Sequence, residues 1–264
     1  MSAKFISLTS DFGLKDPYVA EIKAVILTIC PTASIIDVTH EVEKFSIRTG
    51  AFMLASVAPY FPKGTVHAAI VDPDVGTPRR PIIVETSQGF FVGPDNGLMM
   101  IAAEAQGIKQ TRVIENKRLM LPYISNTFHG RDVFAPAAAH IANGSPLEEF
   151  GSKITDAVKP EFALVTRNRG SLEGEVLHVD DFGNIITNLP GKEIAGFQER
   201  LVQVEFPPHP PRQIKIFKAY ADVDPQEPLA LIGSHGYLEI ALNRGNAARA
   251  FSVKTGNKIT LSKT

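Results

Sequence analysis

Residues 4–30, KFISLTSDFGLKDPYVAEIKAVILTIC, place a strand, a turn and a helix in immediate succession. The β-branched run at residues 4–9 is typical of a buried strand. Asp16 stands before Pro17, which predicts a helix that starts there with Asp16 as its N-cap. The apolar spacing then continues to Cys30, which we expect to be buried. A strand followed directly by a helix indicates an α/β domain.

The same alternation continues to about residue 150. We expect further strands at residues 34–38, 65–71, 82–85 and 90–92, and helices at residues 46–58, 98–105 and 131–141. The predicted fold class is therefore α/β, with an N-terminal layered α/β domain over residues 1–160 built on a mainly parallel sheet.

Beyond residue 160 the pattern changes to period-two alternation without an amphipathic helix. Strands are predicted at residues 172–178, 185–188, 200–204, 214–217, 229–232, 237–242 and 258–261. We therefore expect a smaller C-terminal domain, residues 161–264, that forms an antiparallel β-barrel-like structure.

The composition narrows the possible partners. With 27 basic and 28 acidic side chains in 264 residues, the chain has no basic surplus for a phosphate backbone, so nucleic acid is not an expected partner. Its apolar runs are shorter than the roughly 20 residues that a membrane span needs. The first residues contain no apolar signal core, so we expect a cytoplasmic protein with no membrane partner. The polar segments described next favour a small-molecule substrate.

Four segments place polar side chains at strand ends and glycine-containing turns, where α/β sheets usually bind ligands. In TSDFG, Asp11 follows the first strand. A carboxylate accepts two hydrogen bonds at once, which suits the 2′ and 3′ hydroxyls of a ribose. The alternative is a plain turn or cap residue.

In VDPDVGTPRR, Asp72 leaves a buried strand and Arg79 follows seven positions later, across a turn. Such a turn can fold the guanidinium back onto the carboxylate, either in a reactive site or as a salt bridge that only fixes the turn. Arg80 can exchange roles with Arg79, but neighbours on an extended segment point in opposite directions, so only one of them should face the site.

In NTFHGRDVFAP, His129 lies in a polar loop before a helix, which makes it the candidate among seven histidines. His140 falls within the following apolar helix and is expected to be packed there. Because no histidine pair shows metal-ligand spacing, we expect neither a metal site nor a cofactor.

In HVDDFGNIITNLP, Asp180 and Asn184 flank a turn whose tip is Phe182, an aromatic surface for a flat ring. A hairpin explains part of this pattern. Near the end of the chain, IGSHGYLEIALNRGNAA adds a polar cluster able to hold an amino-acid zwitterion or an adenine edge, although a hairpin accounts for it too. Its members are Ser234, Tyr237, Glu239 and Asn246.

Taken in order, TSDFG, VDPDVGTPRR, FHGRD and DDFGNIITN resemble the S-adenosyl-L-methionine hydroxide adenosyltransferases, which are related to the fluorinating and chlorinating enzymes that use the same substrate. The likeness extends from Phe5 to about Ala248. The resemblance implies an enzyme that cleaves S-adenosyl-L-methionine, or its biologically inactive sulfonium epimer, with water at C5′ to give adenosine and L-methionine. It also implies a homotrimer whose active sites lie between the two domain types of neighbouring subunits.

By that resemblance, the family's water-binding triad corresponds to Asp72, Arg79 and His129 as catalytic residues, and its ribose-binding aspartate to Asp11. The contacts to the methionine and adenosine ends correspond to Asp180, Asn184 and Ser234. Two positions depart from the family pattern. Asp74 stands where glycine is usual, and Asp181 replaces a usually basic residue beside Asp180.

Three other functions remain open. A halogenase relative would bind a halide ion, which the negative charge of Asp72 would repel. A sensor without catalysis would use Asp11, Asn184 and Ser234 to hold adenosine or S-adenosyl-L-methionine, with the triad as a structural salt-bridge network. An interaction protein would use the polar loops for assembly.

Overall fold

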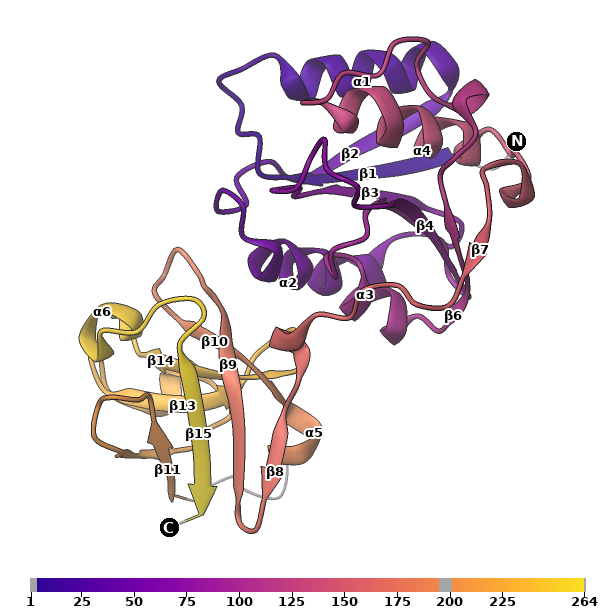
Figure 1. The fold of residues 1–264 in the computed structure, drawn as a ribbon. Coiled ribbons are helices and arrows are strands. Elements are labelled where there is room, and N and C mark those ends of the chain that lie inside the picture. The colour runs from indigo at the N-terminus through magenta and orange to yellow at the C-terminus, as the bar shows by residue number, and fades with distance from the viewer. Residues whose placement is uncertain (1–3, 195–200, 264) are drawn as a thin grey trace. The chain divides into compact units, whose positions relative to one another are not determined.

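A computed structural model describes residues 4–194 and 201–263 and separates the chain into two compact units, residues 1–160 and 161–264. The N-terminal unit is built on a seven-stranded sheet (Figure 1). In spatial order its strands are β2 (Ala33–Thr39), β1 (Lys4–Ser10), β3 (Val66–Ile70), β5 (Phe90–Pro94), β4 (Pro81–Thr86), β6 (Ile108–Val113) and β7 (Lys153–Ile154). The first four strands run parallel and the last three add on antiparallel, so the predicted α/β class is confirmed.

Helices cover both faces of this sheet. Figure 1 shows α1 (Tyr18–Ile29) and α4 (Ala135–Ala142) on one face, and α2 (Ile47–Val57) and α3 (Met100–Ala105) on the other. The fully buried side chains of Ile6 on β1 and Ile22 on α1 belong to one apolar cluster that also includes the alanines of α4. Burial of these apolar faces holds the three layers together. Short helical turns complete the unit, namely Ala58–Tyr60, Lys117–Leu119, Leu147–Glu149 and a π-helix at Gly130–Phe134.

The start of α1 differs from the prediction. Pro17 is the N-cap residue, the helix begins at Tyr18, and no side chain caps it, so the prediction of Asp16 as the N-cap is wrong. The Pro17 carbonyl accepts the first hydrogen bond of the helix, from Glu21 N at 2.9 Å, so Asp16 lies one residue too early to cap. Cys30 at the other end is fully buried, as predicted.

The C-terminal unit is an antiparallel sheet that nearly closes on itself, which confirms the barrel-like prediction. Along the path its strands are β12 (Arg212–Lys215), β11 (Leu201–Glu205), β15 (Lys258–Lys263), β9 (Ser171–Val179), β10 (Ile185–Pro190), β14 (Tyr237–Leu242) and β13 (Pro228–Ile232), with β8 (Thr166–Asn168) beside β9. A bridge between Ile216 and Ala230 connects the two ends. Arg200, the first residue of one predicted strand, lies outside the described residues.

Helices in this unit are short: α5 (Gly191–Ile194), α6 (Ala247–Phe251) and single turns at Glu161–Ala163 and Tyr220–Asp222. Its core includes an apolar cluster from the inner faces of the strands, with Val176, Ile185 and Ile240, and a smaller one around Leu229. In the part of the chain that the structure describes, every helix is too short or too polar to cross a bilayer.

Candidate active site

The carboxyl ends of β2, β1 and β3 meet at one edge of the N-terminal sheet, which is where open α/β sheets present their ligands. Asp11 follows β1, Lys44 and Phe45 lie in the loop after β2, and Asp72 lies beyond β3. A cavity of about 390 Å³ opens there. Its lining residues are Asp11, Phe12, Asp16, Tyr18, Lys44, Phe45, Ile70, Asp72, Val75, Thr127, Phe128, His129 and Gly130.

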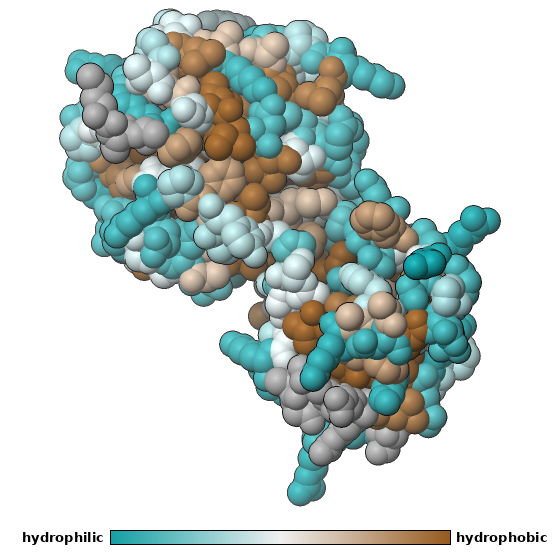
Figure 2. Space-filling view, turned by 180° about the vertical axis from the view of Figure 1, so that it is seen from behind, coloured by the Kyte–Doolittle hydropathy of each residue, from teal (hydrophilic) through white to brown (hydrophobic). Residues whose placement is uncertain are grey.

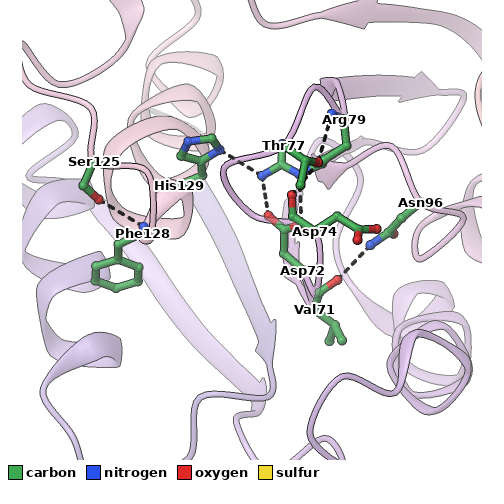
Figure 3. A network of polar contacts seen from close by, with 9 residues as sticks. All are labelled: Val71, Asp72, Asp74, Thr77, Arg79, Asn96, Ser125, Phe128 and His129. Carbon is green, nitrogen blue, oxygen red and sulfur yellow. Dashed lines mark hydrogen bonds and ion pairs between the residues drawn. The ribbon is translucent and has the colours of Figure 1, made fainter.

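Asp72 and Arg79 form a two-point ion pair at this cavity (Figure 3). Arg79 Nε donates to Asp72 Oδ1 at 2.8 Å, and Arg79 Nη2 donates to Asp72 Oδ2. The side chains are only 6 % (Asp72) and 8 % (Arg79) exposed, so little water competes for the contact. The guanidinium also lies over the ring of Phe134, 5.1 Å from its centroid.

His129 completes the group. It is the N-cap residue of the π-helix, and Arg79 Nη2 lies 3.0 Å from its Nδ1 (Figure 3). A guanidinium can only donate, so Nδ1 must accept and the proton of a neutral ring resides on Nε2. Burial, followed by the positive charge of Arg79, lowers the pKa of His129 below its ordinary value, which keeps the ring neutral. The three predicted residues are thus brought together.

Two backbone features bring the Asp72 turn against the His129 loop. The Asp72 carbonyl accepts from Val75 N at 3.3 Å, and Gly76 has a φ of +82°. A Cβ on Gly76 would lie 2.4 Å from the carbonyl oxygen of Asn126, so only glycine allows this approach. Asp74 does not share the left-handed conformation, and its departure from the family pattern leaves the turn intact. Arg80 points away and pairs with Asp95 and Asp156, so only Arg79 faces the site.

Asp11 is buried at the cavity wall. Its Oδ2 accepts from Phe45 N at 2.9 Å, and its carbonyl accepts from Lys44 Nζ. Phe45 has a φ of +64°, a strained conformation for a phenylalanine, and its side chain is 69 % exposed at the rim of the cavity. Strain of this kind is concentrated at functional sites.

Several lining residues were not predicted. Lys44, Phe45 and Tyr18 carry no motif, but Lys44 and Phe45 follow the carboxyl end of β2, next to β1, and this position alone marks them. Asp16, expected to be a structural cap, is exposed and lines the cavity instead.

A second cavity, of about 780 Å³, lies in the C-terminal unit. Its lining residues are Asp180, Phe182, Asn184, Tyr220, Leu242, Asn243, Arg244, Gly245 and Asn246. Both oxygens of Asp180 accept from Asn184, Oδ1 from the backbone N at 2.8 Å and Oδ2 from Nδ2 at 2.9 Å. This hairpin leaves Phe182 79 % exposed, an aromatic surface as predicted, while Asp181 is exposed. Asn246 caps α6 through Arg249 N.

The remaining predicted contacts lie away from this cavity. Ser234 is exposed in the turn between β13 and β14, and Tyr237 is half-buried on β14. Glu239 is buried and accepts from the hydroxyl of Tyr220, which does line the cavity. Burial, together with the charge of Asp180, raises the pKa of Glu239. These residues are close in sequence but belong to different elements: Ser234 lies in a turn, Tyr237 and Glu239 share one face of β14, and Asn246 caps α6.

Within residues 4–194 and 201–263, no three histidine, cysteine or carboxylate side chains converge as metal ligands would. The polar groups that line the first cavity are instead three aspartates, a lysine and an imidazole, with the Arg79 guanidinium paired to Asp72. This set suits polar and charged organic ligands.

Known proteins match the chain over almost its full length. The SAM hydroxide adenosyltransferase N-terminal domain matches residues 6–151, and the corresponding C-terminal domain matches residues 174–260. An (R)-S-adenosyl-L-methionine hydrolase from Salinispora tropica is 38 % identical, covering 98 % of this chain and 97 % of its own. A fluorinase from Actinoplanes sp. is 28 % identical, covering 98 % and 97 %.

A solved structure shares the whole fold. The crystal structure of an uncharacterized conserved protein from Thermotoga maritima superposes with a TM-score of 0.90 at 39 % identity, covering 98 % of this chain and 100 % of its own. The likeness in sequence and in fold therefore extends over both units. From both domain matches and the near-complete coverage of its relatives, the chain belongs to the SAM hydroxide adenosyltransferase family.

Proposed function

We propose that this protein is a hydrolase that cleaves S-adenosyl-L-methionine, in the (R) form for which its relative from Salinispora tropica is named, with water to give adenosine and L-methionine. One observation supports this most: Asp72 and Arg79, from one turn, meet His129, from a loop 50 residues further on, and Asp72 and His129 line one cavity. A sulfonium leaves as a neutral thioether, so the reaction needs an aligned nucleophile rather than an acid or a redox cofactor.

In the proposed mechanism, Asp72 accepts a hydrogen bond from the attacking water and takes up its proton. Arg79 fixes both oxygens of Asp72, so the carboxylate cannot rotate away from the water. Because Nδ1 of His129 is engaged by Arg79, the ring acts through Nε2–H, which can donate to the water oxygen and orient a lone pair toward C5′. Holding the reactants in line contributes about 7 to 11 kcal/mol to lowering the barrier.

The substrate contacts follow from the two cavities. Asp11 binds the ribose hydroxyls beside Phe45, and Asp180 and Asn184 hold the other end of the substrate, with Phe182 and Asn246 beside them. The two cavities lie in different units. On the family resemblance, we also propose a homotrimer whose sites combine the N-terminal unit of one subunit with the C-terminal unit of a neighbour. Figure 2 shows apolar residues at the surface of both units, as subunit contacts require. The protein is further proposed to act in the cytoplasm, without a metal or cofactor.

The halogenase alternative is disfavoured because Asp72 faces the cavity with its negative charge, where a halide would have to bind. The sensor alternative keeps the same ligand contacts but treats the triad as structural. It predicts binding of adenosine with no product formed from either epimer.

The test is an incubation of the purified protein with each sulfonium epimer, in which adenosine release is measured by chromatography. Native protein should release adenosine without added halide, and Asp72→Asn should lower kcat by about 10²–10⁴-fold while adenosine still binds. Asp74→Asn is the matched control, because its exposed side chain lies in the same turn outside the triad, and it should keep native kcat. A native kcat in Asp72→Asn would contradict the proposed mechanism. Adenosine binding by the native protein without turnover of either epimer would support the sensor alternative.

A further inference from the structure

Ser10, the residue before Asp11, belongs to a second group of three side chains behind the cavity. Ser10 Oγ lies 2.7 Å from His40 Nδ1, and His40 Nε2 lies 3.1 Å from Asp37 Oδ1 at an angle too oblique for a regular hydrogen bond. Asp37 in turn pairs with Lys23 Nζ of α1 at 2.5 Å. The arrangement resembles the serine, histidine and aspartate of serine hydrolases.

This group has no access to a substrate. Ser10 is 1 % exposed and His40 is 4 % exposed, and neither lines the cavity. A nucleophilic serine must reach the reacting atom, so Ser10 cannot be one. The function of the group must therefore lie in what its members hold.

What they hold is the turn that carries Asp11. Phe12 N donates to Ser10 Oγ at 3.4 Å, Gly13 N donates to the His40 carbonyl at 2.7 Å, and Val42 N donates to the Ser10 carbonyl at 3.3 Å. The backbone on both sides of Asp11 is thus tied to residues 40–42. The same loop continues to Phe45, whose N–H binds the Asp11 carboxylate.

The charge of Asp37 favours one direction for these hydrogen bonds. The carboxylate of Asp37 favours the proton of His40 on Nε2, so Nδ1 accepts from the Ser10 hydroxyl. With its own hydrogen committed to His40, Ser10 Oγ presents lone pairs to Phe12 N. In this arrangement the Ser10 hydroxyl and Phe12 N each have an acceptor, which favours one conformation of the turn.

We infer that Ser10, His40 and Asp37 form a clamp of positioning residues that presets the Asp11 carboxylate for the ribose of the substrate. The inference rests on the proposed function through the role of Asp11. An unclamped turn must be ordered when the ligand binds, which weakens ribose binding and leaves the triad of Asp72 untouched.

The chain contains its own matched control. Ser7, three residues earlier on β1, lies 2.7 Å from His67 Nδ1, and both residues are buried. This pair has the same Oγ–Nδ1 distance on the same strand, but it takes no part in the hydrogen bonds that hold the Asp11 turn. If the histidines only stabilise the fold, substitution of either one should therefore have the same effect. If His40 positions the ribose-binding turn, only its substitution should weaken ribose binding.

The experiment measures adenosine affinity by calorimetry, and amide hydrogen exchange over residues 10–13, on full-length variants. In His40→Gln the side-chain amide lies near the position of Nε2, so it no longer accepts a hydrogen bond from Ser10. In His40→Asn the amide lies near the position of Nδ1 and can still accept from Ser10. We expect His40→Gln to weaken adenosine binding about tenfold and to speed exchange of the Phe12 and Gly13 amides. His40→Asn should largely restore both, His67→Gln should change neither, and kcat should stay within about twofold in all three.

Combination with Asp11→Ala separates the two claims. His40→Gln should add nothing to the loss of affinity in Asp11→Ala, because the clamp acts through Asp11. Two results would overturn the clamp alone. One is a native adenosine affinity in His40→Gln, and the other is a further tenfold loss of affinity when His40→Gln is added to Asp11→Ala. Native affinity in Asp11→Ala overturns the ribose role of Asp11 and the clamp with it. If His40→Gln does not fold, Ser10→Ala removes the same hydrogen bond and is judged by the same results.

Discussion

At the scale of single residues, the polarity of the hydrogen bonds around Arg79 decides what each neighbour can do. Arg79 can only donate, so the two Asp72 oxygens and Nδ1 of His129 must each present a lone pair to it. Protonation of His129 would place an N–H group against the guanidinium and break the contact. The triad is therefore competent only with a neutral imidazole.

This requirement predicts the pH dependence of turnover. Because burial and Arg79 lower the pKa of His129, the ring stays neutral at pH 7 and gains its proton only below its ordinary pKa of about 6.5. We expect kcat to be constant above that value and to fall as the pH drops through an inflection below it. The profile is measured by adenosine release from pH 4.5 to 8. An inflection above 6.5, or one that persists unchanged in His129→Asn, contradicts this assignment.

The sequence identifies the charged residues of the site better than the apolar ones. Asp72, Arg79 and His129 are recognisable because charged groups and a histidine at strand ends and turns are rarely needed for packing. Phe45 and Tyr18 cannot be recognised in this way, because aromatic residues usually pack in the core and only the folded structure shows that these two are exposed. The same applies to His40, whose role depends on its distance from Ser10 rather than on any spacing in the chain.

At the scale of elements, the site depends on a close approach between two loops. The turn of residues 72–79 and the loop before the π-helix meet at Gly76 and Asn126, and the π-helix presents His129. Such π-helical turns are frequent at functional sites. No pattern in the sequence distinguishes this π-helix from the start of an ordinary helix, so the sequence predicts one continuous helix there. Strand β6 was likewise missed, because IKQTRV is largely polar and mostly exposed at its start.

The close approach predicts the effect of Gly76→Ala. A Cβ at this position costs about 1–2 kcal/mol for its positive φ and also clashes with the Asn126 carbonyl, which pushes the His129 loop away from Arg79. Both thermal stability and kcat should fall. Gly64→Ala is the control, because Gly64 has a φ of +88° but no atom within 4 Å of the added Cβ. It should lose stability alone, and equal kcat losses in the two variants would contradict the role of the loop contact.

At the scale of the whole molecule, the two cavities place the proposed substrate contacts on different units. Fold class and the barrel-like second unit follow from periodicity, since α/β alternation and period-two strands are properties of local sequence. Assembly does not, because a subunit interface depends on the shape of a whole surface. The trimer therefore remains a proposal with its own test.

Mixed trimers provide that test. Asp72→Asn damages only the N-terminal unit and Asn184→Ala only the C-terminal unit, so each variant alone should be nearly inactive. If each site combines two subunits, trimers assembled from an equal mixture contain about a quarter native sites, and activity returns. Adenosine release after co-expression or mixed refolding measures the recovery, and light scattering gives the mass of the assembly. No recovery from mixed trimers would mean that each site is built from one chain.

The central claim is that a water molecule held by Asp72, Arg79 and His129 attacks C5′ of the ribose. Turnover in ¹⁸O-labelled water, with mass spectrometry of both products, tests it directly. The account predicts one ¹⁸O atom in the 5′ hydroxyl of adenosine and none in methionine. Unlabelled adenosine, or label in methionine, would contradict it.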